Sequence, residues 1–335
     1  MPTKKKPTIY DVAKNSGISI STISRVLNSP DKVNPETRRR VMASIDKLGF
    51  VPKAEARARA MRNTNRIGVL TPFFTAPSFV QRLRGVASAL SKANYELVIY
   101  PVDSVEHLEG YISSIPVMQN IDGLIIMSLA IDDKDAHRLH DNGMETVLIE
   151  YSHPRLNSIV IDDFQGGRLV GEHLIKKGHT LIAFLGDIEA PERYEIHPVK
   201  SRLLGFVDSL KSAGISLPKQ FIGSCSYDWE ETTVAAHKLL SASKRPTAVF
   251  VASDMQALSV MKVARQLNLR IPDDLAIVGF DDIDVAEHVD LTTIRQHLDE
   301  SGRLAVEILL SRITDPSRPL KNMNLPLDLV ERLTT

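Results

Sequence analysis

Cysteine is nearly absent from this sequence, since Cys225 is the only one among 335 residues. A single thiol excludes an intramolecular disulfide framework and a cysteine cluster for zinc. No apolar run approaches the roughly 18 residues of a membrane-spanning helix. The N-terminal stretch MPTKKKPTIYDV also lacks the apolar segment of a signal peptide. These absences predict a protein that stays in the cytoplasm.

Nucleotide-binding and catalytic signatures are missing as well. No apolar strand is followed by GxGxxG or by GxxxxGK with Ser or Thr, and the spacing of Gly166, Gly167 and Gly171 fits neither pattern. The histidines lack metal-ligand spacing, and no nucleophile or base constellation is present beyond paired carboxylates. We therefore expect no cofactor, no metal site and no enzymatic activity.

Charge is plentiful but unevenly distributed. Residues 1–66 hold 15 Lys or Arg and 5 Asp or Glu, whereas the remainder holds 26 basic and 36 acidic residues. The zero net charge of the chain therefore hides a head of +10 and a body of −10. A basic head on an acidic body indicates a polyanionic partner for the head alone. An unstructured basic tail is the alternative, and helical patterning in the head argues against it.

The head carries the signals of three short helices. Thr8 with Asp11 three residues later is a variant of the capping box, and Ser19 and Asn34 are further capping residues. Gly17 supplies the turn between the first two helices, and a proline follows Asn34. We expect helices to about residue 15 and through residue 28, and a third whose apolar residues 41, 45 and 48 close a common core.

The second predicted helix has two chemically different sides. The apolar residues of the stretch 23–27 cluster on one side of a helical wheel, while Ser21, Ser24 and Arg25 face the opposite way. Arg25 can donate two hydrogen bonds to guanine, Ser21 is a short adaptable partner, and Ile20 can touch a thymine methyl. This arrangement predicts a helix-turn-helix that enters the major groove of DNA, with an ordinary helical hairpin as the alternative.

The stretch TIYDVAKNSGISISTISRVLNSPDKVNPETRRRVMASIDKLGFVP, residues 8–52, resembles the headpiece of the lactose-repressor family of bacterial transcription regulators. The resemblance implies that Ile20, Ser21 and Arg25 read the major groove and that Tyr10, Asn28 and Arg38 support or touch the DNA backbone. Backbone amides at the helix starts, with side chains nearby, suit phosphate binding. With the hinge described next, the predicted DNA contacts are Thr8, Tyr10, Ser19, Ile20, Ser21, Arg25, Asn28, Lys32, Arg38, Ala56 and Arg59.

The segment KAEARARAMR, within residues 53–65, corresponds in the resemblance to the hinge helix that forms when two protomers sit side by side on DNA. The usual sequence of this hinge in the family is Ala-Arg-x-Leu, and its leucine inserts into the minor groove. Here Ala56 and Arg57 are followed by Ala58 and Arg59. Arginine prefers a narrow, negative minor groove, so we expect Arg59 to read groove width and to bend DNA less. A helical linker whose arginines meet only phosphates is the alternative.

The body, from residue 66 onwards, alternates short apolar strands with helical segments. Such alternation implies doubly wound parallel sheets, and about 270 residues with two series of strands imply two lobes. The expected strands are 67–70, 96–100, 123–127, 146–150 and 158–161 in the first lobe and 181–186, 248–253 and 275–280 in the second.

Ligands of such sheets bind beyond the carboxyl ends of strands, which places a cleft between the lobes. An aromatic face, carboxylate acceptors and one guanidinium suit a sugar or sugar derivative, and sugar acids and nucleobases are the alternative ligand classes.

The body also resembles the effector domain of the same family, itself similar to periplasmic sugar-binding proteins. By that resemblance Arg202 and Asp281 are the strongest contacts, and Trp229 caps the ligand. The predicted effector site comprises Phe74, Ser128, Glu150, Arg202, Trp229, Ser253, Asp281 and Gln296. Phe73, Met127 and Asp254 also follow strands and are expected in the cleft.

Simpler structural roles are the alternatives to effector binding. They are helix capping for Asp281 and Asp282, lobe packing for Trp229, a solvated strand end for Glu150 and a structural ion pair for Arg202.

The expected domains are a headpiece over 1–52, a hinge and linker over 53–65 and an effector-binding and dimerisation domain over 66–335. The N-lobe comprises about 66–163 plus 298–325, and the C-lobe about 164–297 plus 326–335, so the chain crosses between them repeatedly. No leucine-heptad tail of the kind that assembles tetramers follows, which predicts a homodimer on a pseudo-palindromic operator.

The function that fits all of this is a sequence-specific DNA-binding transcription regulator, foremost a repressor, whose affinity for operator DNA is controlled by a small effector. A corepressor-dependent or activating regulator is the alternative within that class. A sugar-binding transport protein would share the body but lack the basic head.

Overall fold

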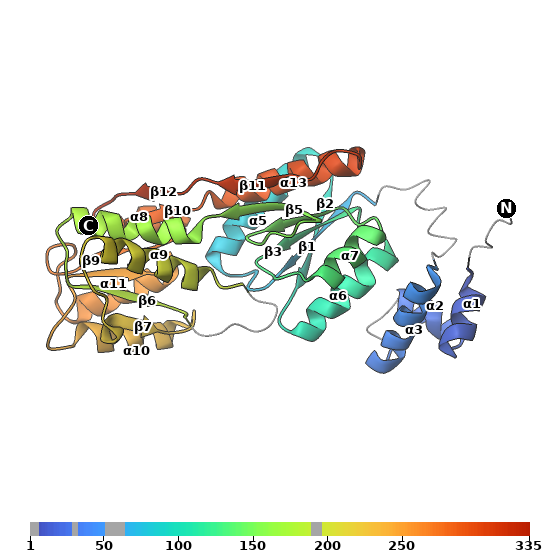
Figure 1. Cartoon of the computed structure of the whole chain (residues 1–335), viewed down its shortest axis with the longest axis horizontal. Coiled ribbons are helices and arrows are strands. Elements are labelled where there is room, and N and C mark those ends of the chain that lie inside the picture. The colour runs from blue at the N-terminus through green and yellow to red at the C-terminus, as the bar shows by residue number, and fades with distance from the viewer. Residues whose placement is uncertain (1–6, 29–32, 51–63, 189–195) are drawn as a thin grey trace.

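The computed structural model describes residues 7–28, 33–50, 64–188 and 196–335, with the side chain of Asn28 left out. Figure 1 places three bodies in a row, namely the headpiece helices, an N-lobe and a C-lobe. The headpiece lies at one end of this row, and the C-terminus lies in the lobe at the other end. Among the described residues, no helix is long and apolar enough to cross a membrane.

The headpiece consists of α1 (Ile9–Ser16), α2 (Ile20–Asn28) and α3 (Pro35–Leu48), which confirms the expected helices. Both the backbone N and the Oγ1 of Thr8 donate to Asp11 Oδ2 at 2.7 Å. Gly17 ends α1 with a φ of 68°, and Asn34 Oδ1 accepts from the backbone of Glu36 at 2.9 Å. Apolar side chains from all three helices form the core, namely Val12, Ile23, Val26, Leu27, Val41, Met42 and Ile45, with Phe50 beside them.

The N-lobe is built on a six-stranded parallel sheet with the strand order β11-β5-β4-β3-β1-β2. Its strands are β1 (Arg66–Thr71), β2 (Glu96–Pro101), β3 (Gly123–Met127), β4 (Thr146–Ile149), β5 (Asn157–Ile161) and β11 (Asn322–Leu325). The helices that flank it are α5 (Pro77–Lys92), α6 (Val105–Met118), α7 (Asp133–Asp141) and α13 (Leu298–Thr314). One apolar core lies under α6 and α7 and a second under α5 and α13, so the sheet is covered on both faces.

The C-lobe has a four-stranded parallel sheet with the order β7-β6-β8-β9. Its strands are β6 (Ile182–Gly186), β7 (Ile222–Ser224), β8 (Ala248–Val251) and β9 (Ala276–Val278). Its helices are α8 (Asp163–Lys176), α9 (Pro198–Ser212), η2 (Lys219–Phe221), α10 (Trp229–Leu240), α11 (Asp254–Gln266) and α12 (Asp284–His288). Apolar cores again lie on both sides of the sheet, so the predicted fold class of two doubly wound lobes behind a helical headpiece is confirmed.

Glycine allows one helix pair in each lobe to approach at backbone contact. A Cβ atom at Gly302 of α13 would lie 2.2 Å from the carbonyl oxygen of Arg82 in α5. A Cβ atom at Gly167 of α8 would lie 1.9 Å from the carbonyl oxygen of Arg202 in α9. Any side chain at either glycine would therefore push the two helices apart.

The chain passes between the lobes around residues 161–163, 296–298 and 325–328. After the second passage α13 and β11 belong to the N-lobe sheet, where β11 pairs with β5. After the third, β12 (Asp328–Val330) pairs antiparallel with β10 (Thr293–Arg295), and Ile277 N donates to Thr334 O in the C-lobe at 2.8 Å. The eight expected strands are present, and β7, β10, β11 and β12 were not anticipated.

Candidate functional site

A cavity of about 840 Å³ lies between the lobes, at the carboxyl ends of both parallel sheets. The N-lobe contributes residues that follow β1, β3 and β4, and the C-lobe contributes residues that follow β6, β7, β8 and β9. This is where ligands of doubly wound sheets bind. The strand-end residues in the lining include Phe73, Ser128, Glu150, Asp187, Ser226, Ser253 and Asp281.

Four of these strand-end residues have a backbone conformation that side-chain-bearing residues rarely adopt. The φ angle is 40° at Phe73, 55° at Ser128, 67° at Glu150 and 122° at Asp281. Strained backbone of this kind gathers at functional sites, where the surrounding structure holds it in place. Both lobes therefore use distorted strand ends to present side chains to the cavity.

Arg202 is a buried cation whose orientation is fixed by three contacts. Its Nε donates to Asp163 Oδ1 at 2.8 Å, its Nη1 donates to the carbonyl of Ala252 at 2.8 Å, and its guanidinium lies 3.6 Å above the ring of Phe280. Burial alone would lower the pKa of Arg202, but the carboxylates of Asp163 and Asp281 outweigh this and raise it. The structural ion pair, which was the alternative to an effector contact, is thus present, and it holds Arg202 as a permanent positive charge that still lines the cavity wall.

Asp281 is linked to Gln296 in the wall of the cavity. The Asp281 carboxylate accepts a hydrogen bond from Gln296 Nε2, and its backbone N donates to the carbonyl of Ile294 at 2.9 Å. Burial raises the pKa of Asp281 to about 7, against the opposing effect of Arg202. The other amide atom, Gln296 Oε1, is buried and has no partner among the described residues. A ligand that donates a hydrogen bond would satisfy it.

The alternative of helix capping does not fit this pair of aspartates. The residue that caps α12 is Ile283, and it has no side-chain cap. Asp282 instead accepts from Arg295 Nε and Arg332 Nη2, each at 2.6 Å, and so ties the crossing strands together. Asp254, also expected in the cleft, is fully buried and accepts from Thr293 Oγ1 at 2.6 Å rather than lining the cavity.

Glu150 is a partly buried, ionised carboxylate with two hydrogen-bond partners and not a solvated strand end. Its Oε1 accepts from Arg82 Nη2 at 2.6 Å, and its Oε2 accepts from Ser128 Oγ. Burial would raise the pKa of Glu150, but the guanidinium of Arg82 outweighs this and lowers it. Arg82 is itself held by Ser301 Oγ at 3.1 Å. These side chains of the N-lobe wall therefore form one hydrogen-bonded network, in which the charge of Arg82 is compensated by that of Glu150.

Aromatic rings face the cavity from both lobes. The ring of Phe73 in the N-lobe lies 6.5 Å from that of Tyr227 in the C-lobe and 6.2 Å from that of Phe79. Trp229, the first residue of α10, is 53% exposed and lines the cavity, so it is available to a ligand and not consumed by lobe packing. Ser253 caps α11 by accepting from the backbone of Gln256 at 3.2 Å and also faces the cavity.

Of the eight residues of the predicted effector site, Phe74 does not line the cavity, and of the other residues expected in the cleft neither Met127 nor Asp254 does. The positive φ at Phe73 and the turn closed by Ala76 N and Phe73 O, at 2.7 Å, bring Phe73 to the wall instead. Four further residues, which the sequence did not predict, line the C-lobe side of the cavity, namely Asp187, His197, Tyr227 and Glu231. The absence of β7 from the expected strands explains two of these omissions, because Tyr227 and Glu231 follow it.

The predicted DNA-reading face of α2 is open to solvent. Ile20, Ser21 and Arg25 are exposed, whereas Ile23 on the opposite side is completely buried. Tyr10 and Ser19 are exposed as well, and Ser19 Oγ accepts from the backbone of Thr22 at 3.2 Å. The helix therefore projects a polar surface from a packed base, as groove recognition requires.

The remaining predicted DNA contacts differ from this pattern. The hydroxyl of Thr8 donates a hydrogen bond to Asp11, and Arg38 Nη2 donates to the carbonyl of Gly110 in the N-lobe at 2.9 Å. Lys32, Ala56 and Arg59, the hinge helix, and the side chain of Asn28 lie outside the described residues.

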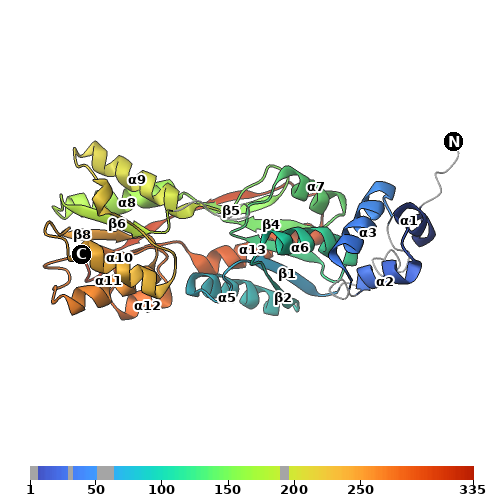
Figure 2. The same cartoon turned by 90° about the horizontal axis from the view of Figure 1, so that it is seen from below.

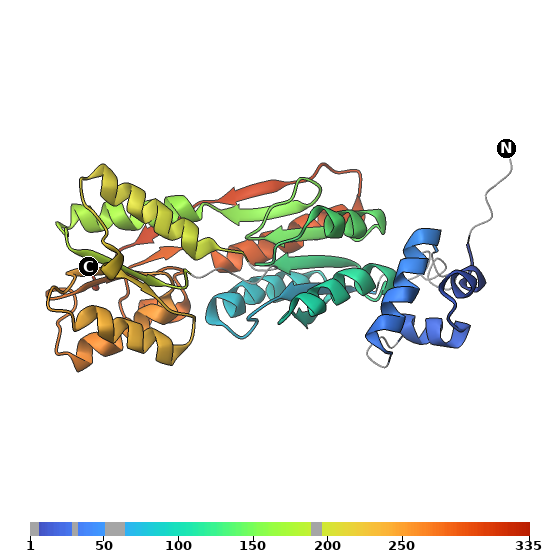
Figure 3. The same cartoon turned by 60° about the horizontal axis from the view of Figure 1, so that its bottom comes forward.

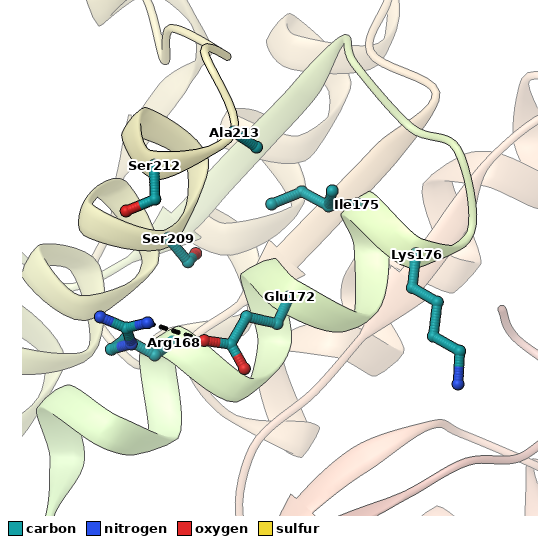
Figure 4. Close-up of a pocket in the computed structure, with 7 residues that line it drawn as sticks. All are labelled: Arg168, Glu172, Ile175, Lys176, Ser209, Ser212 and Ala213. Carbon is teal, nitrogen blue, oxygen red and sulfur yellow. Dashed lines mark hydrogen bonds and ion pairs between the residues drawn. The ribbon is translucent and has the colours of Figure 1, made fainter.

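A smaller groove of about 320 Å³ lies on the outer surface of the C-lobe, between α8 and α9 (Figure 4). Its lining comes from these two helices and the residue after α9, not from strand ends. Arg168 is paired there with Glu172 at 2.9 Å and with Asp208 at 2.7 Å. Arg168 and Glu172 are thus paired with each other, and the strand-end side chains that suit ligand binding line the cavity between the lobes instead.

Comparison with known proteins covers both parts of the chain. Residues 8–53 match the model of bacterial regulatory proteins of the lacI family, and residues 171–335 match a periplasmic binding protein-like domain. The chain is 32% identical to the HTH-type transcriptional repressor PurR of Vibrio vulnificus (strain CMCP6), over 98% of each chain.

Two solved structures extend this similarity to three dimensions. The complex of the transcriptional regulator CelR with cellobiose has a TM-score of 0.71 at 28% identity, covering 98% of this chain and 100% of that one. The lac repressor dimer bound to operator and the anti-inducer ONPF has a TM-score of 0.69 at 28% identity, covering 98% and 99%. With an open helix-turn-helix and a cavity between two parallel-sheet lobes, the chain belongs to the LacI family of bacterial regulatory proteins, and it is a transcription regulator of that kind.

Proposed function

We propose that this regulator represses transcription by binding a pseudo-palindromic operator with the headpieces of a homodimer, and that an uncharged sugar or sugar derivative in the cavity controls this binding. The observation that carries the DNA-binding part is the exposed face of α2. Ile20, Ser21 and Arg25 project from a helix whose other side is the headpiece core. Direct readout of base edges needs such a helix on a rigid base.

The dimer has two lines of support. One is the similarity to the lac repressor dimer bound to operator. The other is the exposed apolar surface of Val80 on α5 and Ile99 on β2, the edge strand of the N-lobe sheet. An uncovered sheet edge with apolar side chains favours pairing with another surface. Two headpieces would then read two half-sites related by the dimer axis.

The charges around the cavity favour an uncharged ligand. The two buried arginines, Arg202 and Arg82, are already paired with Asp163 and Glu150 at 2.8 and 2.6 Å. Asp281, Asp187 and Glu231 add further carboxyl groups to the lining. A sugar acid or a sugar phosphate would bring another negative charge into this surrounding, whereas the hydroxyls of a neutral sugar can donate to it.

The shape of the lining points to the same ligand class. Carboxyl acceptors and the unpartnered Gln296 Oε1 suit a ring edge rich in hydroxyls, and the Phe73, Tyr227 and Trp229 rings suit its apolar face. The relative CelR was solved with cellobiose, a neutral sugar. We therefore infer a neutral mono- or disaccharide or a close derivative.

Control of DNA binding would follow from contacts with both lobes. A ligand held by Glu150 on one side and Asp281 on the other favours the lobe arrangement in which both are reached. A ligand can shift an equilibrium only by its affinity difference between the two states. A change of 10² to 10³ in operator affinity would need about 3 to 4 kcal/mol of such coupling.

The proposal is tested by ligand screening and DNA selection on the full chain. Neutral sugars, sugar acids and sugar phosphates are compared in thermal-shift assays, where a ligand at a hundredfold excess over its Kd stabilises by about 2.7 kcal/mol. A neutral sugar should raise the Tm of the wild type and leave Asp281→Ala unchanged. DNA is then selected from a random pool, and its affinity is titrated with and without that sugar. Stabilisation by anionic sugars alone would reject the ligand class, and selected DNA without two-fold symmetry would reject the dimeric arrangement.

A further inference from the structure

The headpiece lies against the N-lobe through α3 and through α2, which packs on α6. Arg38 Nη2, on α3, donates to the carbonyl of Gly110 on α6 at 2.9 Å. Two turns further along α3, Asp46 forms an ion pair with Arg138 of α7. Figures 2 and 3 place the headpiece helices beside the end of the N-lobe that faces away from the C-lobe. Both polar contacts come from one side of α3, so they form a single contact surface.

An apolar contact lies next to these polar ones. Val117, near the end of α6, is 6% exposed and belongs to the same apolar cluster as Val26, Val41 and Met42 of the headpiece. The N-lobe thus contributes a side chain to the core of the headpiece. Burial of an apolar side chain is favourable, so this contact adds to the two polar ones in holding the headpiece.

Docking leaves the DNA-reading face uncovered. Ile20, Ser21 and Arg25 of α2 are exposed while α3 is in contact with the N-lobe. The contact therefore fixes the direction in which α2 points without competing with DNA for the same side chains. A free headpiece would have to lose its rotational freedom on binding, and a docked one has already lost it.

The docking surface is also connected to the cavity. Ser128, at the end of β3, lines the cavity, and α7 begins only five residues later at Asp133. Leu129 and Ile131 between them are 0% and 1% exposed, so the connection is packed into the core. Arg138 of α7 additionally donates to the carbonyl of Ser113 in α6 at 2.6 Å. A shift at the cavity wall can therefore reach both helices that contact α3.

We propose that the α6–α7 face of the N-lobe, comprising Gly110, Val117 and Arg138, is a docking surface for the headpiece of the same chain. It supplies a second path, beside the chain connection through residues 51–63, by which the effector cavity sets the orientation of α2. The coupling path from the cavity to α2 depends on the operator binding proposed above, whereas the docking of the headpiece on the N-lobe does not.

Charge exchange across the ion pair tests the docking without DNA or effector. The full chain is studied by hydrogen exchange as wild type, Asp46→Arg, Arg138→Asp and the double variant that restores an opposite-charge pair. Lys134→Glu, an exposed residue of the same α7, is the matched control. Amides of α3 and of the second half of α6 should exchange about three- to tenfold faster in both single variants, return toward wild type in the double variant and stay unchanged in the control.

The Asp46→Arg variant separates docking from helix damage. Asp46 lies in the last turn of α3, where a negative charge opposes the helix dipole and a positive charge favours it. The substitution should therefore strengthen an isolated α3, so faster exchange can arise only from lost contact with the N-lobe. Exchange in both single variants equal to that of Lys134→Glu would overturn the docking surface.

The second readout is affinity for DNA selected from a random pool with the wild type. Both single variants should lose about three- to tenfold in affinity, and the double variant should recover it. Faster exchange without any change in DNA affinity would overturn the coupling path. Failure of the wild type to select any DNA would instead overturn the proposed function, and the exchange experiment would still decide the docking.

Discussion

The ligand-free protein should become more stable when Asp281 is replaced by asparagine, and the gain should depend on pH. Burial raises the pKa of the Asp281 carboxyl from an ordinary value of 3.8 to about 7. Between these values the folded chain binds more protons than the unfolded chain, so stability falls as the pH rises through this window. Above pH 7 the full penalty of an ionised Asp281 is present. Asparagine removes it and keeps the Oδ1 acceptor for Gln296 Nε2.

The magnitude follows from the width of the pH window. At about 1.4 kcal/mol per pH unit, the interval between 3.8 and about 7 corresponds to roughly 4 kcal/mol. At pH 5 the wild type carries only about two fifths of this penalty. In a chain of this length each kcal/mol moves Tm by about 2 °C, which predicts a gain of roughly 8 °C at pH 8 and 3 °C at pH 5.

Thermal unfolding of the full chain at pH 8 and pH 5 measures both gains. Asp282→Asn is the matched control, because its carboxylate accepts from Arg295 and Arg332 at 2.6 Å and its loss should lower Tm at both pH values. The Asp281→Asn variant should also bind the effector about tenfold more weakly, since an amide is a poorer acceptor than a carboxylate. An equal gain at both pH values, or a lower Tm at pH 8, would refute the assignment of a buried, raised carboxyl to Asp281.

Four further predictions concern DNA and the lobes. Arg25→Ala should cost about 1–3 kcal/mol in DNA binding and relax specificity at one base pair, and uniform weakening across sequences would make Arg25 a phosphate contact. Raising salt should weaken DNA binding steeply with log K linear in log[salt], and a flat dependence would contradict the electrostatic role of the basic head. Arg84 bridges Asp284 of the C-lobe and Asp299 of the N-lobe, each at 2.6 Å, so Arg84→Ala should change effector affinity and leave the selected DNA sequence unaltered. Calorimetric affinity equal to wild type would exclude that bridge from lobe closure. Arg59 should bend the operator less than a leucine wedge does, and an electrophoretic bend as large as that given by leucine-bearing relatives would sink this idea.

Strand ends were the most informative feature of the sequence. Long apolar runs such as 123–127 are buried on every side and predict strands without ambiguity, and the rule that ligands bind at their carboxyl ends led to Ser128, Glu150 and Asp281. The strands that escaped prediction are three or four residues long and mixed in polarity, as in Asn322–Leu325. Their pairing depends on neighbours distant in sequence, which no local pattern contains.

Partners distant in sequence also limited the prediction of the site. Arg82 stands in the middle of a helix, and only the fold brings it to Glu150, 68 residues away. The same holds for Arg38, which the resemblance assigned to DNA and which the structure places against Gly110. Phe74 and Phe73 are chemically equivalent in sequence, and the backbone turn alone decides which ring faces the cavity.

The glycines at the helix contacts bear on how such a regulator can acquire a new ligand. Gly302 and Gly167 each press against the carbonyl of a buried arginine, Arg82 in one lobe and Arg202 in the other. The backbone of both arginines is therefore packed against a neighbouring helix. A substitution of either glycine would displace that helix pair before it changed the recognition of a ligand. We therefore expect a change of ligand, in evolution or in an engineered biosensor, to come from residues that follow the strands, such as Phe73, Tyr227 and Trp229, which line the cavity and form none of the hydrogen bonds that hold either arginine.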